Sequence, residues 1–316
     1  MGVEEEILSR VIYLTVKIVP VIVIAVFFAN LLSEYGVIKR LDFLVKPLIR
    51  GANLPDGSGA VIVTSLASGT ASYSMLGNHH QKGELDDTQV IVISIMNTFF
   101  HHIHHFFTYW VPVAIPLLGL YTGLMYVMIR MSIGLIMTLS AVAIGRVFIK
   151  TTKKTISGSE DHSSETNSVK IRHAVEGTMK TLKLIIPRLY LVYTAAVIFL
   201  ATGYLERFGE LAEPLAHVFG LPGEAITIIA IQLVDVTSGY VLTGALLQSG
   251  VLNPFQAVTA LLLGTMITLS MTYAKHSLPS KIVFFGPKLG TKIAFYNLVL
   301  NMSLTLIALA LMVFFF

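Results

Sequence analysis

Long apolar runs constrain the fold of this chain more than any other feature of its sequence. The runs lie near residues 11–32, 88–109, 113–149, 184–202, 255–274 and 293–316. Most of them approach the roughly 20 residues with which a helix crosses the hydrocarbon core of a bilayer. Because the chain is also 54% hydrophobic and only 13% charged, it lies outside the usual range of soluble domains. We therefore expect an all-α integral membrane protein with six transmembrane helices, a multi-pass protein in the lipid bilayer of the cell membrane.

Several classes of function are disfavoured by what the sequence lacks. There is no cysteine, so no disulfide, thiolate metal site or thiol nucleophile is available. No serine, histidine and acid form a recognisable nucleophile motif, and no H-E-x-x-H metal motif occurs. We expect no enzyme and no resident cofactor. The net charge of +4 does not indicate a nucleic-acid partner, because basic residues in a membrane protein mainly report orientation. Homo-oligomer formation is left open.

The second half of the chain repeats the first at a shift of 167 residues. Glycines, prolines, glutamines and tyrosines fall in one register, among them Pro55 and Pro222, Tyr73 and Tyr240, Gly77 and Gly244, Gln89 and Gln256, Thr98 and Thr265, Pro112 and Pro279, and Gly119 and Gly286. Between the halves lies a polar stretch whose composition cannot form a core. We expect a first repeat over residues 1–150, a flexible cytoplasmic linker over 151–170 and a second repeat over 171–316.

Each repeat carries small hydroxyl and glycine residues inside an apolar segment. The motif SGTAS occupies Ser68 to Ser72 within residues 57–80, and DVTSG occupies Asp235 to Gly239 within residues 223–247. Each segment could be one spanning helix. Alternatively it could be two half-helices that form a re-entrant hairpin, with the motif at a tip near the bilayer midplane, since ten residues of helix rise about 15 Å.

The basic residues favour the hairpins. Loops that stay in the cytoplasm carry an excess of lysine and arginine, and three basic stretches occur: Lys39 to Arg50, Arg146 to Arg188, and Lys275 to Lys292. All three fall on one side only if the segments re-enter. The basic loops are then cytoplasmic, and the N- and C-termini are predicted to lie outside. With three spans and one hairpin in each half, the second half is inverted relative to the first.

An inverted repeat with broken helices at the midplane is typical of secondary transporters, in which half-helix ends hold the solute and its coupling ion. Each half of the chain resembles the Gate, or nucleoside recognition, domain. The resemblance lies in the order of its segments: an apolar leg, the motif SGTAS or DVTSG, a second apolar leg, a short polar mouth and a spanning helix. That domain is shared by concentrative nucleoside transporters and the membrane part of the ferrous iron transporter FeoB. The resemblance covers both halves, although the GTPase domain of FeoB is missing here. It implies that both tips and the helices over 88–109 and 255–274 face one central site.

The helix after the first tip carries a histidine cluster, SIMNTFFHHIHHFF. At spacings of three and four, Asn97, His101, His104 and His105 share one face, whereas His102 points elsewhere. Imidazoles at such spacing can relay protons or chelate a metal. Alternatively they are half-exposed histidines in an interfacial aromatic belt.

Two charged residues fall inside apolar segments. Asp235 is a candidate proton carrier or cation ligand, or else a carboxylate that caps the second half-helix. Arg130 needs a carboxylate or an anionic solute as its partner, or else it snorkels. We assign charge or coupling roles to Asp235, Arg130 and His105. The predicted metal ligands are His101, His104 and His105. The predicted solute-binding residues are Ser68, Gly69, Thr70, Ser72, Asn97, His101, Asp235, Thr237, Ser238, Thr265 and Thr268.

The function that we expect is secondary transport of a small polar, nucleoside-like solute by alternating access, coupled to H⁺ or Na⁺. One alternative is a divalent-metal transporter that uses the histidine cluster. The other is a membrane protein with a structural or signalling role and no transport.

Overall fold

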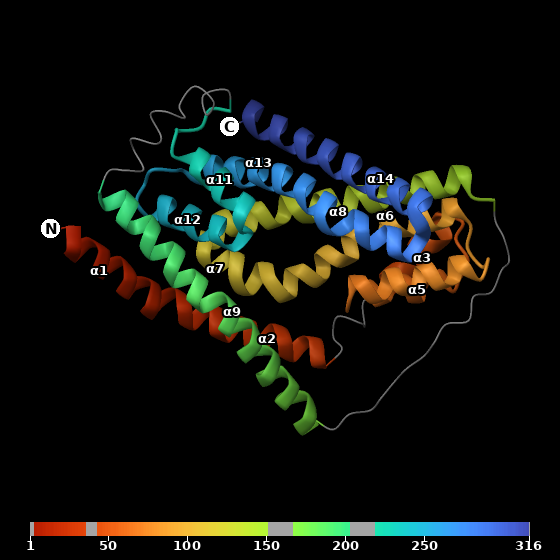
Figure 1. Ribbon diagram of the computed structural model, residues 1–316, viewed down its shortest axis with the longest axis horizontal. Coiled ribbons are helices and arrows are strands. Elements are labelled where there is room, and N and C mark those ends of the chain that lie inside the picture. Colours follow the sequence, from red (N-terminus) through yellow and green to blue (C-terminus); the bar gives the residue numbers. More distant parts are fainter. Residues whose placement is uncertain (1–2, 36–42, 151–166, 203–218, 316) are drawn as a thin grey trace.

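The computed structural model describes residues 3–35, 43–150, 167–202 and 219–315 (Figure 1). Every regular element in this part of the chain is helical. In the first half these are α1 (Val3–Tyr13), η1 (Leu14–Ile18), α2 (Val19–Glu34), α3 (Val45–Gly51), α4 (Ser58–Ser65), α5 (Gly69–Gln81), α6 (Asp87–His105), η3 (Phe106–Ala114), α7 (Ile115–Leu118) and α8 (Leu120–Phe148). In the second half they are α9 (Asn167–Ala201), α11 (Ala225–Val234), α12 (Val236–Gln248), α13 (Pro254–Thr272), η4 (Tyr273–Ser277) and α14 (Leu278–Phe315).

Within the described residues, four helical stretches are long and apolar enough to cross a membrane. They are Ile7–Phe28, Asp87–Leu118, Leu120–Phe148 and Pro254–Phe314. The last has 61 residues and would be about 90 Å long if straight, three times the hydrocarbon core. It is interrupted at Gly286, whose φ of 77° is not helical. In the described residues the expected all-helical architecture is therefore confirmed, with four stretches able to cross a membrane.

The predicted boundary between residues 109 and 113 is wrong. The chain stays helical through Pro112, which lies inside the π-helix η3, and breaks only at Gly119, where φ is 79°. The wider turn of a π-helix makes room for the proline ring, which clashes with the preceding turn of an α-helix. The second half is similar: the π-helix η4 ends shortly before Pro279, and the helix breaks at Gly286.

Both glycine- and hydroxyl-bearing segments are broken, as predicted. Ser68, before α5, has φ −155° and ψ 117°, and Asp235, before α12, has φ −154° and ψ 125°. In the first segment the chain folds back on itself, because Ser72 donates its hydroxyl hydrogen to the carbonyl of Val61 at 2.8 Å. Eleven residues of straight helix would separate these groups by about 16 Å. Helices α4 and α5 therefore form one hairpin, and α11 and α12, which also pack together, form the other.

The backbone repeats its irregular features at the spacing of 167 residues. The positive-φ residues fall into pairs, Asn53 with Gly220, Gly83 with Gly250, and Gly119 with Gly286. The capping box of Asp86 and Gln89 at the start of α6 recurs as Asn253 and Gln256 at the start of α13. The π-helices η3 and η4 also begin at equivalent positions, Phe106 and Tyr273. These local conformations support the predicted duplication.

Contacts between the halves are reciprocal. A Cβ on Gly77 of α5 would lie 2.8 Å from the carbonyl oxygen of Phe284, and a Cβ on the equivalent Gly244 of α12 would lie closer still to that of Leu117. Leu117 and Phe284 are themselves equivalent. Each hairpin therefore packs closely against the other half, and such an exchange of equivalent contacts is what a two-fold axis produces.

The first helices of the two halves pack against each other in opposite directions (Figure 1). Tyr190 of α9 donates a hydrogen bond to Thr15, and Asn30 of α2 donates one to Thr178. As the residue number rises along one helix, it falls along the other, so the pair is antiparallel.

The predicted linker over residues 151–170 is too long at its second end. Residues 151–166 lie outside the described part, but α9 begins at Asn167. Asn and Ser at this point are residues that start helices, and the first turns carry an ion pair between Arg172 and Glu176 at 2.8 Å. The polar residues 167–170 therefore lie in a helix.

Replacement of Gly77 or Gly244 by alanine is expected to destabilise the protein by about 1–3 kcal/mol, because the added methyl group meets a backbone carbonyl that cannot rotate away. Gly69→Ala is the matched control, since it adds the same group to α5 and meets only the His101 ring at 3.4 Å. Thermal unfolding of the detergent-purified protein measures the effect. Equal midpoints for the three variants would contradict the close packing.

Candidate functional site

A cavity of about 530 Å³ lies between the two hairpins. Its walls come from α4, α5, α6, η3, α8 and α12–α14, so both halves of the chain contribute. The volume is within the range of pockets that hold small organic ligands.

The cavity is shared by equivalent positions of the two repeats. Eight pairs of lining residues are related by the shift of 167: Gly69 and Val236, Tyr73 and Tyr240, Thr98 and Thr265, His101 and Thr268, His102 and Leu269, His105 and Thr272, Trp110 and Ser277, and Arg130 and Asn297. The cavity therefore lies where the two halves meet. The first half lines it with histidines at three positions where the second half places Thr268, Leu269 and Thr272.

The structure brings together about half of the predicted site residues. The cavity is lined by Gly69, Asn97, His101, His105, Arg130, Thr265 and Thr268. It is not lined by Ser68, Thr70, Ser72, His104, Asp235, Thr237 and Ser238. The helices that follow the hairpins in the chain thus supply more of the cavity wall than the hairpin tips do.

The tip residues outside the cavity hold the hairpins in shape. The side chains of Ser68 and Asp235 cap α5 and α12 by accepting hydrogen bonds from the amides of Ala71 and Ser238. The Asp235 carboxylate also accepts the hydroxyl hydrogen of Ser238 at 2.7 Å. Thr237 shares a 2.7 Å hydrogen bond with the Tyr109 hydroxyl of η3. The capping alternative for Asp235 matches this geometry, and its role in coupling stays a prediction.

The histidine face differs from the predicted one. His102 lines the cavity together with His101 and His105, whereas the Nδ1 atom of His104 lies 2.8 Å from the carbonyl oxygen of Leu66. His104 thus ties the end of α4 to α6. The rings of His101, His104 and His105 have centroids 4.6–6.2 Å apart. Among the described residues, however, no three His, Asp or Glu side chains converge in an arrangement that could hold a metal ion.

Each repeat places one buried carboxamide beside its hairpin, but from different helices. In the first half, Asn97 of α6 donates a hydrogen bond to Ser72 at 3.0 Å. Its equivalent is Gly264, and the space there is filled by Gln232 of α11, which a Cβ on Gly264 would overlap. The amide is retained although the residue that supplies it has changed.

Several buried polar atoms of the cavity wall have no hydrogen-bond partner within the described residues: Oδ1 of Asn97, Nδ1 of His101, Nδ1 of His102 and Nη1 of Arg130. An unpartnered buried polar group costs about 1–3 kcal/mol. Four of them at one cavity indicate that a ligand or water partners them.

Sequence reasoning missed the tyrosines and one lysine. Tyr73, Tyr109, Tyr126, Tyr240 and Tyr273 line the cavity, and the Tyr240 hydroxyl donates to that of Tyr126 at 3.1 Å. The repetition of Tyr73 as Tyr240 was the available signal. Lys281 was assigned to a cytoplasmic basic stretch, but it is only 6% exposed and lines the cavity.

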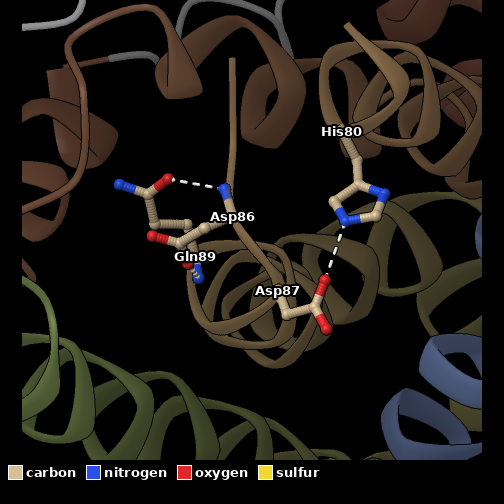
Figure 2. A network of polar contacts seen from close by, with 4 residues as sticks. All are labelled: His80, Asp86, Asp87 and Gln89. Atoms are coloured by element: carbon tan, nitrogen blue, oxygen red, sulfur yellow. Dashed lines mark hydrogen bonds and ion pairs between the residues drawn. The ribbon is translucent and has the colours of Figure 1, made fainter. Parts of the chain in front are cut away.

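The polar mouth of the first hairpin lies at the junction of α5 and α6 (Figure 2). Nε2 of His80 lies 2.9 Å from Oδ1 of Asp87, and the side chains of Asp86 and Gln89 each accept a hydrogen bond from the other's backbone amide at 2.9 Å (Figure 2). This mouth fixes the turn between the helices, and its residues do not line the cavity.

Comparison with known proteins matches residues 15–148 to the Gate family, described as nucleoside recognition. Similar proteins from Methanocaldococcus jannaschii cover nearly the whole chain. Uncharacterized protein MJ0871 is 26% identical over 94% of this chain and 93% of its own, and uncharacterized protein MJ0880 is 28% identical over 96% and 98%. Uncharacterized protein MJ1556 is 27% identical over 91% of each chain. No solved structure matches the chain.

Replacement of His104 by alanine is expected to lower the stability of the protein by about 1–3 kcal/mol, because the Leu66 carbonyl loses its partner at the hairpin tip. His101→Ala is the matched control, since it removes an imidazole from the same helix whose Nδ1 atom has no partner within the described residues. The unfolding midpoint in detergent distinguishes the two. An equal loss in both variants would contradict a separate role for His104.

Proposed function

We propose that this protein is a secondary transporter of a small polar solute, in keeping with the match of residues 15–148 to the Gate family, described as nucleoside recognition. The solute binds in the central cavity and crosses the membrane by alternating access. The observation that carries the proposal is the cavity itself, which is lined by equivalent residues of both repeats and by buried polar atoms without protein partners. Transporters of repeat architecture hold their solutes at such a position. Hairpins packed without a cavity would instead have favoured a structural or signalling role.

The topology that we propose has six spans and two re-entrant hairpins, with the second repeat inverted. The break at Gly286 divides Pro254–Phe314 into two spans. The sixth span is α9, which is equivalent to the helix of α1, η1 and α2 and packs antiparallel to it. Antiparallel packing of equivalent helices is what inversion across the membrane requires. Irregular backbone at the tips is tolerated at membrane depth because protein surrounds it.

The proposed orientation places the basic loops in the cytoplasm and both termini outside. Lys281 no longer counts in this argument, because it is buried at the cavity. The third basic stretch still has three exposed lysines, Lys275, Lys288 and Lys292. This excess of positive charge still favours a cytoplasmic position.

Coupling to H⁺ through Asp235 is tested by Asp235→Asn. Asparagine caps a helix as well as aspartate does, so the variant retains the fold but carries no proton. We expect it to abolish pH-gradient-driven uptake in proteoliposomes, measured with a solute selected by screening nucleosides, amines and carboxylates for thermal stabilisation. Asp235→Ala serves as the comparison, since loss of the cap costs about 1 kcal/mol of stability. Unchanged uptake by Asp235→Asn rejects a coupling role and leaves Asp235 as a cap.

Alternating access is tested by single cysteines, which this cysteine-free chain allows without background labelling. Cysteine at Thr98, in the cavity wall, is expected to react with a membrane-impermeant thiosulfonate reagent added to either side of the membrane. Leu139→Cys is the control, because Leu139 is half exposed on α8 away from the cavity and faces lipid in this topology. Reaction of Thr98→Cys from one side only, under every condition of pH and ion gradient, would contradict the proposal.

A further inference from the structure

Two buried basic side chains line the central cavity, one from each half of the chain. Arg130 lies on α8 and Lys281 lies on α14, and each is only 6% exposed. They do not occupy equivalent positions, because Arg130 is equivalent to Asn297 and Lys281 to Ala114. Duplication alone therefore does not explain them. Each charge is a separate addition to the same cavity.

No carboxylate offsets these charges in the cavity wall that the structure describes, which contains neither aspartate nor glutamate. Ion pairs between described residues include those of His79 with Glu84, His80 with Asp87, Arg172 with Glu176 and His173 with Glu34. None of these four includes Arg130 or Lys281. Asp235, the acid of the second hairpin tip, does not line the cavity. Its Oδ2 atom accepts hydrogen bonds from both the amide and the hydroxyl group of Ser238.

Lys281 is held in place without a counter-charge, and Arg130 has a buried nitrogen atom without a hydrogen-bond partner among the described residues. Nζ of Lys281 donates to the Ser277 hydroxyl at 2.5 Å and lies 4.7 Å from the ring centroid of Tyr73 and 5.5 Å from that of Tyr273. Such cation–π contacts orient an ammonium group and leave its charge intact. Nη1 of Arg130 is buried and has no hydrogen-bond partner among the described residues. A buried charge without a counter-charge is costly, so a bound anion would relieve that cost.

The rest of the wall fits a ring-containing body beside the charged group. Tyrosine rings and Trp110 supply flat apolar surfaces, and their hydroxyl and indole groups donate hydrogen bonds. The same two positive charges repel a bare divalent metal, in agreement with the absence of a metal-holding cluster in the described residues.

We propose that the solute of this cavity is a small organic anion, with a carboxylate or phosphate group bound between Arg130 and Lys281 and a ring against the tyrosines. The inference rests on the proposed transport function for its biological meaning, but the binding site can be tested without transport. The planar guanidinium of Arg130 can bind either acid group through two hydrogen bonds, so the two groups share one recognition chemistry.

The test measures binding to the full-length detergent-purified protein through Trp110, the only tryptophan of the chain and a residue of the cavity wall. The probes are matched pairs, adenosine monophosphate with adenosine and benzoate with benzamide, together with iodide and caesium as anionic and cationic quenchers at equal ionic strength. We expect an anionic member to bind at least tenfold more tightly than its neutral partner, and iodide to quench Trp110 more than caesium does when each is compared with its quenching of free tryptophan. The pair that responds distinguishes phosphate from carboxylate.

Arg130→Gln and Lys281→Gln are each expected to weaken anion binding at least tenfold and to reduce the preference for iodide. Arg146→Gln on α8 and Lys288→Gln on α14 are the matched controls, since both residues are exposed on the same helices and should leave binding unchanged. Arg130→Lys preserves the charge and is expected to retain part of the affinity, which separates a charge effect from a folding defect.

The proposal is overturned by tighter or equal binding of the neutral partners, by equal quenching from iodide and caesium, by no response to any anion, or by anion binding that the Arg130 and Lys281 variants leave unchanged. A failure of the transport proposal looks different. In that case anions still bind and depend on both basic residues, but a cysteine at Thr98 reacts from one side of the membrane only.

Discussion

The close approach of each hairpin to the opposite half is the constraint on which the cavity depends. Gly77 of α5 contacts the backbone at Phe284, and Gly244 of α12 contacts the backbone at Leu117. Because packed backbone does not deform continuously, we expect each hairpin to move together with the helix of the other half that it contacts. A movement that opens the cavity on one side is then expected to involve both halves.

The sequence predicted the breaks because they depend on local chemistry. A hydroxyl or carboxylate that caps a half-helix, as at Ser68 and Asp235, is visible in the residue types. The choice of cavity face on α6 was not predictable in the same way. Asn97 and His104, seven residues apart, both contact the first hairpin, at Ser72 and Leu66. Asn97 also lines the cavity, as His102 and His105 do, whereas His104 does not. The helical period predicts which residues share a face of the helix, but it does not predict which part of the protein packs against that face.

Lys281 shows a different limit of sequence reasoning. The assignment of basic residues to one side of the membrane assumes that each of them lies in a loop. Because Lys281 follows the predicted span over 255–274, the sequence places it in such a loop. The π-helix η4 and the continued helix to Phe285 carry it instead into the protein interior. The tyrosines were missed because they read as ordinary apolar or interfacial residues. Their role appears only when both repeats supply them to one cavity, as Tyr73 and Tyr240 do.

The exchanged carboxamides beside the hairpins have a consequence for how the two halves can diverge. An asparagine at Gly264 would collide with Gln232, and a serine at Gln232 would leave empty space opposite Gly264. The second half therefore cannot regain the arrangement of the first by one substitution that preserves packing. The two halves therefore keep different residues beside their hairpins. Recombination between the two halves of the gene would place either two amide side chains or none in the space between positions 232 and 264. A chain that has diverged in this way keeps unlike contacts beside its two hairpins.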